Sequence, residues 1–287
     1  MKSSLYLEFR PPRALSDRVM CFWTQQVDSA GGEYLHPVLP DGCVDIVWIG
    51  DAAPVVAGPA TRRVIVGLPA GAALIGVRFR PGWAAASLGP PACELRDQDV
   101  PLSAIWRRAG ALAEPGHGQR PAPARLRALA MDLAKRLSES PMPDAAVRAS
   151  VAWLAQHPAG RIGDLAAMTG LGERRLHRRF REAVGYGPKQ FQRIMRFQRL
   201  LLRAPACREL ASAAADAGYA DQAHMCREVK ALAGEPPRRV LDRRAGTLSM
   251  SDLFNTADGA SRYPKPSMTE WLRSNESADQ HPYPGRR

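Results

Sequence analysis

Cysteine, lysine and long apolar runs are all scarce in this chain of 287 residues. The five cysteines lie far apart, and no two of them have the spacing of zinc ligands: Cys21, Cys43, Cys93, Cys207 and Cys226. Their odd number and their scatter argue against a zinc site and against a disulfide framework. We therefore expect no metal, and the sequence suggests no cofactor.

The N-terminus lacks the features of a secretory signal peptide. Glu8 and Arg10 interrupt it early, and no apolar run anywhere reaches the roughly 18 residues that a membrane-spanning helix requires. The sequence therefore predicts no membrane partner and a cytoplasmic location.

Signatures of the common catalytic sites are missing as well. The sequence has no Gly-x-Ser-x-Gly elbow, no metal-spaced His/Cys/Asp cluster and no phosphate-binding loop. Cys43, with Asp41 and His36 nearby in sequence, is the single candidate nucleophile. We expect a protein that is not an enzyme.

Positive charge is abundant, and almost all of it is arginine. The formal net charge is +12, and 35 of the 40 basic residues are arginine. A GC-rich coding sequence would also produce such an excess, but the charge is concentrated: residues 172–203 contain 10 basic and 2 acidic residues. This concentration favours a polyanionic partner, because each neutralised phosphate releases condensed counterions.

A pattern of about 27 residues occurs twice, at 162–188 and at 210–236. Each copy predicts a short apolar helix, a glycine turn, a second helix with polar and basic residues, and then Gly-x-Pro. Gly170 and Gly218 stand at the turns, where glycine adopts a positive φ at little cost. The sequence therefore predicts two helix-turn-helix units.

In the first unit, the second helix has two contrasting faces. Leu176, Phe180 and Val184 recur at i, i+4 and i+8 and predict a face toward the core. The opposite side carries Glu173, Arg174, His177, Arg178 and Arg181. A solvated charged face is the ordinary alternative, but such a face mixes charges of both signs. The scarcity of acidic partners favours insertion into a major groove.

A connecting helix is predicted from Pro188 to about Ala204, with Arg196, Arg199 and Arg203 as a basic stripe. Such a rigid connection would fix the separation of the two units, and successive major grooves lie about 34 Å apart.

These features extend over some 80 residues, and they include Leu165-Ala166, Leu176-x-Arg178-x-Phe180, Gly185-x-x-Pro188, Gly218-Tyr219, Asp221-Gln222 and Gly234-x-Pro236. In this combination residues 144–244 resemble the DNA-binding domain of the AraC/XylS family of bacterial transcription regulators. The resemblance implies base contacts and phosphate contacts at matching positions. The implied base-contact residues are Arg174, His177 and Arg178 in the first unit, and Gln222, Ala223, His224 and Arg227 in the second. The implied phosphate-contact residues are Arg179, Arg196 and Arg199.

The sequence departs from the family pattern at several positions. Gly172 stands where Ser or Thr usually caps the first recognition helix, and Met225, Val229 and Val240 stand where aromatic residues are common. These departures predict a more loosely packed second unit that contributes less to specificity.

The N-terminal part predicts a β-rich domain. Apolar runs at 44–48, 64–66 and 74–79 predict strands, whereas 83–88, 103–112 and 126–137 predict helices. The overall class is α+β, with an N-terminal β-rich domain with flanking helices and a C-terminal all-α domain of two helix-turn-helix units joined by a long helix. We expect an N-terminal domain at 1–142, a DNA-binding domain at 143–244 and a largely disordered tail at 245–287, with a docking segment near Phe254 as an alternative.

Residues 5–110 resemble a poorly characterised sensor-like domain that precedes such DNA-binding domains. The family resemblance implies that this domain senses a small-molecule effector or mediates dimerisation. Five polar residues are candidates for lining an effector pocket, with surface ion pairs as the alternative: His36, Asp41, Asp45, Arg78 and Arg80.

Together these observations predict a sequence-specific transcription regulator that inserts two recognition helices into successive major grooves of promoter DNA. RNA polymerase is a further expected partner, and the expected location is the nucleoid. The alternative is a non-specific, nucleoid-like DNA-binding protein, which would show steep salt dependence without a preferred site.

Overall fold

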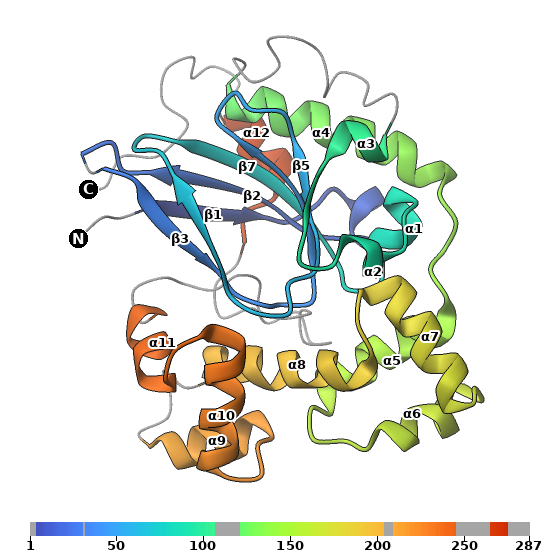
Figure 1. Ribbon diagram of the computed structural model, residues 1–287. Helices are drawn as coiled ribbons and strands as arrows, with labels where there is room; N and C mark the ends of the chain where they lie inside the picture. The colour runs from blue at the N-terminus through green and yellow to red at the C-terminus, as the bar shows by residue number, and fades with distance from the viewer. Residues whose placement is uncertain (1–3, 31, 107–120, 204–208, 245–264, 275–287) are drawn as a thin grey trace.

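The computed structural model describes residues 4–30, 32–106, 121–203, 209–244 and 265–274. An antiparallel β-sheet with helices across one face forms the N-terminal part, and the C-terminal part is helical (Figure 1). The chain is therefore α+β, as predicted.

Two antiparallel sheets build the N-terminal part. The larger sheet has the order β1 (Ser4–Phe9), β2 (Val19–Val27), β7 (Ala73–Phe79), β4 (Val44–Ile49), β5 (Val55–Ala57) and β8 (Asp99–Pro101). The smaller sheet pairs β3 (Tyr34–Val38) with β6 (Val64–Leu68). The predicted strands correspond to β4, β6 and β7, whereas the sequence analysis did not predict the other five.

The two faces of the larger sheet pack against different layers. Successive side chains of a strand point to opposite faces, and on β4 Val44, Ile46 and Trp48 are buried in the cluster that contains the helices. Val47, between them, packs on the opposite side in a smaller cluster with Leu68 of β6. The sheet is thus the middle layer between α-helices and the β3–β6 pair.

Helices cover the first face of the sheet. They are the short 3-10 helix η1 (Arg13–Leu15), α1 (Ala84–Leu88), α2 (Ala92–Leu95), α3 (Leu102–Ile105) and α4 (Ala122–Glu139). Leu126, Leu129 and Leu133 of α4 are fully buried against the sheet. The helix expected over 103–112 is α3, which ends earlier, and residues 107–120 lie outside the described part.

Residues 265–274 form a folded segment within the tail that the sequence predicts to be largely disordered, and the rest of that tail lies outside the described residues. They include α12 (Met268–Ser274), whose Met268 and Leu272 are buried in the core of the N-terminal part. The Arg10 N–H donates to the Pro266 carbonyl at 3.0 Å, and the Met268 N–H donates to the Arg10 carbonyl at 3.2 Å. Two apolar side chains at i and i+4 form one buried face, which the polar composition of the tail concealed. Phe254, the predicted docking position, lies outside the described residues.

Seven helices follow in the C-terminal part: α5 (Ala145–Gln156), α6 (Ile162–Thr169), α7 (Glu173–Val184), α8 (Pro188–Arg203), α9 (Leu210–Ala217), α10 (Gln222–Ala233) and α11 (Pro237–Arg244). Asp144 caps α5 by accepting from the Ala146 N–H at 2.9 Å and the Val147 N–H at 3.3 Å. This cap follows the proline-rich segment where the sequence analysis placed the domain boundary. The limits at residues 142 and 244 stay predictions.

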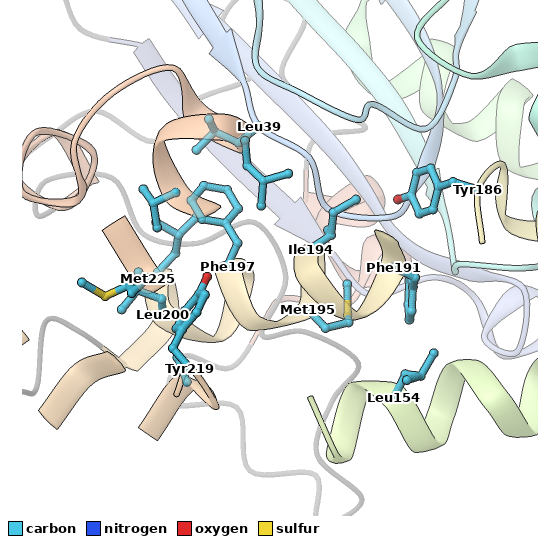
Figure 2. Packing of buried hydrophobic residues seen from close by; sticks show 14 of the residues in the cluster. Leu39, Leu154, Tyr186, Phe191, Ile194, Met195, Phe197, Leu200, Tyr219 and Met225 are labelled. Atoms are coloured by element: carbon cyan, nitrogen blue, oxygen red, sulfur yellow. The ribbon is translucent and has the colours of Figure 1, made fainter. Parts of the chain in front are cut away.

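The β3–β4 connection joins the two parts. Leu39 lies in the hydrophobic cluster of the helical part, close to α8 (Figure 2). Gln198 of α8 donates to the Pro40 carbonyl, and Gly42 packs against Phe191. The N-terminal part therefore contacts the helix that connects the two helix-turn-helix units.

Candidate nucleic-acid interface

The first helix-turn-helix unit consists of α6, a glycine turn and α7. Gly170 adopts a φ of 66°, the left-handed conformation predicted for this turn. Leu176, Phe180 and Val184 of α7 are buried, and the Phe180 ring meets Phe191 of α8 edge-on at 5.6 Å. This packing fixes which face of α7 is left to solvent.

The outward face of α7 carries a stripe of basic residues. Arg174, His177, Arg178 and Arg181 are all exposed. Within the described ranges, no carboxylate pairs with any of the three arginines. Arg181, which the predicted contact set omitted, extends the stripe along the same face. The stripe is thus available to phosphates and base edges.

Arg179 is held inward rather than presented to a partner. Its Nη1 lies 2.8 Å from Asp144 Oδ2, and the side chains are 32% and 29% exposed. Asp144 is also the cap of α5, so this ion pair ties α7 to α5. The structure therefore gives Arg179 a positioning contact, and its phosphate contact stays a prediction.

The second unit repeats the arrangement with α9 and α10. Gly218 takes a φ of 88° at the turn, and Asp221 caps α10 by accepting from the His224 N–H at 2.6 Å. Gln222, Ala223, Arg227 and Lys230 are exposed along α10. Lys230 was not part of the predicted contact set.

In the second unit, the residues at which the sequence departs from the family pattern are buried in the core. Met225 and Val229 are fully buried, and Val240 is 5% exposed. Smaller side chains thus fill these positions without exposing the core. Whether this unit contributes less specificity stays a prediction.

His224 is partly withdrawn from the surface. Its Nε2 lies 3.4 Å from Glu228 Oε1, and its ring meets Tyr219 edge-on at 5.4 Å. The side chain is 30% exposed. These contacts direct His224 toward the helix-turn-helix core, which weakens the predicted base contact.

Arg196, a predicted phosphate contact, is buried between helices. Its side chain is buried, and both Nη2 distances to the Glu228 carboxylate are 2.9 Å. Its Nη1 donates to the Pro158 carbonyl at 3.1 Å. A buried guanidinium with these partners cannot reach a phosphate, so Arg196 joins α8, α10 and the α5–α6 connection instead.

The charge on Glu228 is stabilised by its basic neighbours. Burial by itself would raise the pKa of Glu228, but hydrogen bonds and charge from Arg196, assisted by Arg193 and His224, lower it overall. The sequence contained a signal for the burial of Glu228, because this residue shares the apolar face of α10 with Met225, Val229 and Leu232.

Arg199 keeps some solvent exposure on α8. Burial and the neighbouring charge of Arg203 lower its pKa. Its phosphate contact stays a prediction.

Three of the five polar residues predicted to line an effector pocket pair with one another. Arg78 donates to both carboxylate oxygens of Asp45, at 3.0 and 2.8 Å, and its Nε lies 3.5 Å from Asp41 Oδ2. Burial raises the pKa of Asp45 to about 6 despite the opposing effect of Arg78. These three residues form one charge cluster between the sheets.

The other two pocket candidates lie elsewhere. His36 contacts Gln25 at 3.3 Å, and Arg80 donates to the Ser16 carbonyl at 3.0 Å. The geometry brings together three of the five predicted residues, and their effector-binding role stays a prediction.

Neither a metal cluster nor a membrane-spanning helix occurs within the described residues. No group of three or more His, Cys, Asp or Glu side chains there is arranged to hold a metal ion. No helix in those ranges is both long and apolar enough to cross a bilayer.

Comparisons with known families match two segments. Residues 7–101 match a domain of unknown function, DUF6597, and residues 165–243 match a helix-turn-helix domain of the AraC type. No curated protein matches the sequence.

Two solved structures of ToxT from Vibrio cholerae resemble the chain at low identity. The apo K231A variant from strain SCE256 is 12% identical, with a TM-score of 0.41, over 83% of this chain and 96% of that chain. ToxT from strain O395 is 10% identical, with a TM-score of 0.44, over 85% and 98%. The chain therefore combines an N-terminal segment similar to the DUF6597 domain with a C-terminal segment similar to a helix-turn-helix domain, the kind of domain that binds DNA.

Proposed function

We propose that the protein regulates transcription by inserting α7 and α10 into successive major grooves of one promoter site. The observation that carries this proposal is the pair of exposed polar and basic stripes, with Arg174, Arg178 and Arg181 on α7, and with Arg227 and Lys230 on α10. Both helices are anchored through buried side chains in one hydrophobic cluster. One hydrophobic core thus holds both reading helices.

The connecting helix supports the proposed spacing. Sixteen residues of α8 span about 24 Å at 1.5 Å per residue. Phe180 of α7 meets Phe191 near the start of α8, and Glu228 of α10 pairs with Arg196 at its middle, so α8 holds both recognition helices. We expect this connection to set a spacing that matches the roughly 34 Å between successive major grooves. A single chain would then cover both grooves without dimerising.

Arginine and glutamine suit base recognition on these helices. Arg174 and Arg178 can pair with guanine edges, and Gln222 can pair with adenine. Ala223 is short enough for a methyl contact only. Exposed residues such as Arg181 and Lys230 would contact phosphates, and Arg199 remains a predicted phosphate contact.

The wider regulatory role follows from this proposal. The protein would act on the chromosome in the cytoplasm and influence RNA polymerase at the bound promoter. An effector, or a second copy of the chain, would act through the N-terminal domain.

Alanine at Arg178 or Arg227 is expected to weaken binding to the preferred site by about 1–3 kcal/mol, or roughly 5- to 150-fold. The loss should be much smaller on scrambled DNA, because a base contact contributes only at the matching base. The site is first obtained by selection from random duplexes, and fluorescence anisotropy then measures Kd.

Arg13→Ala is the matched control, because Arg13 is exposed on η1, away from both recognition helices. If selection returns no motif, the protein is the non-specific DNA-binding alternative. Equal affinity of the wild type and the Arg178→Ala, Arg227→Ala double variant for the selected site would show that α7 and α10 do not read bases.

A further inference from the structure

The β5–β6 connection of the N-terminal part contacts the ends of both recognition helices. Pro59 packs directly against Gly185, which follows α7. At the other end of the connection, the Arg63 N–H donates to the Leu232 carbonyl of α10 at 2.7 Å, and its guanidinium pairs with Glu235. One short segment of the N-terminal part thus lies beside both DNA-reading units.

A local carboxylate holds this segment in place. Asp97 Oδ1 accepts from the Thr61 N–H at 2.7 Å, and Asp97 Oδ2 accepts from the Thr61 hydroxyl at 2.8 Å. Asp97 itself has a φ of 57°, a left-handed conformation that aspartate tolerates better than most residues. The residue after Thr61 and the residue before Asp97 are both arginines, Arg62 and Arg96.

Arg62 and Arg96 border an open hollow of about 700 Å³. His177 and Arg181 of α7 line it from one side, and Ala231 lines it from α10. No acidic residue is among its lining residues. Three arginines and a histidine therefore surround one hollow that has no carboxylate of its own to neutralise them.

The hollow continues both exposed stripes. Arg181 follows Arg178 by about one helical turn along the outward face of α7, and Ala231 follows Arg227 by about one turn on α10. Between two adjacent major grooves, DNA presents the phosphates of the intervening minor groove. We expect the hollow to face those phosphates when both helices are inserted.

We propose that Arg62 and Arg96 bind the DNA backbone between the two major-groove contacts, so that the N-terminal domain forms part of the DNA interface. Both side chains are exposed, and within the described part of the chain neither has an ion-pair partner. This inference rests on the proposed insertion of α7 and α10. It assigns a DNA-contact role to residues outside the helix-turn-helix domain.

The test measures the salt dependence of DNA binding by the full chain. For the Arg62→Ala, Arg96→Ala variant, the slope of log K against log salt should fall by about 2 in magnitude, because each phosphate contact contributes about 0.9. Affinity at about 0.15 M salt should fall on the order of tenfold, to a similar extent on selected and scrambled duplexes. The Arg62→Lys, Arg96→Lys variant should retain most of the slope.

Arg10→Ala, Arg13→Ala is the charge-matched control, since both residues are exposed in the N-terminal part and neither lines the hollow. Circular dichroism establishes that each variant is folded. A slope equal to that of the wild type, or a reduction no larger than in the control, would overturn the proposal.

Two further outcomes separate the possible failures. If calorimetry shows inorganic phosphate binding that Arg62→Ala, Arg96→Ala abolishes while the DNA slope is unchanged, the hollow holds a free anion and the proposal is wrong. If instead Arg178→Ala, Arg227→Ala has no effect on the selected site, the proposed function itself fails.

Discussion

Replacement of Arg196 by alanine is expected to lower the free energy of unfolding by about 3–5 kcal/mol. The change leaves the carboxylate of Glu228 buried without its main partner, and it also removes the hydrogen bond to the Pro158 carbonyl. An unpaired buried charge costs far more than the pair contributes. Urea unfolding followed by circular dichroism measures the loss.

Arg193→Ala is the matched control, because Arg193 lies on the same helix as Arg196 and pairs with the same Glu228 carboxylate. The Arg193 Nε lies 3.0 Å from Glu228 Oε1, but its side chain is 32% exposed, and partly solvated ion pairs contribute about 0–1 kcal/mol. Simultaneous replacement by apolar residues, Arg196→Met with Glu228→Leu, should recover much of the stability. If Arg196→Ala unfolds like the wild type and changes only the salt dependence of DNA binding, Arg196 is a phosphate contact after all.

The Met268→Ala, Leu272→Ala variant is expected to lose about 4–10 kcal/mol of unfolding free energy, since truncation of each buried Met or Leu costs about 2–5 kcal/mol. Met268 is 1% exposed and Leu272 is 8% exposed, and both lie in the hydrophobic cluster under the larger sheet. The loss should appear in thermal or urea unfolding of the full chain.

Met131→Ala, Met142→Ala provides the control, because these methionines are 68% and 57% exposed. Exposed substitutions of this kind change stability by about 0.5 kcal/mol or less. Equal stability of the buried and exposed double variants would show that α12 does not complete the core. The expected result makes residues 265–274 a structural part of the N-terminal half, although they follow the DNA-binding domain in sequence.

The elements that the sequence predicted well are those whose evidence is local. In α7, Leu176, Phe180 and Val184 repeat at helical spacing and are buried as expected. Gly170, Asp144 and Pro188 mark a turn, a cap and a helix start through their own backbone chemistry. Such signals need no knowledge of the rest of the chain.

The sequence did not predict what an arginine contacts across the fold. Arg196 and Arg199 occupy one predicted basic stripe, yet only Arg196 is buried against Glu228, 32 residues away. Arg179 pairs with Asp144 at a separation of 35 residues. Helical spacing predicts the side of a helix on which a residue lies, but not the element that covers that side.

The sequence by itself determined two helix-turn-helix units, their apolar faces and a β-rich N-terminal part, because periodicity and turn chemistry are properties of neighbouring residues. The tertiary structure decided which arginines stay exposed, that α12 returns to the first core, and that Arg62 and Arg96 lie beside α7. These are contacts between distant segments. They depend on how whole elements pack to bury apolar surface and pair charge, which no local pattern records.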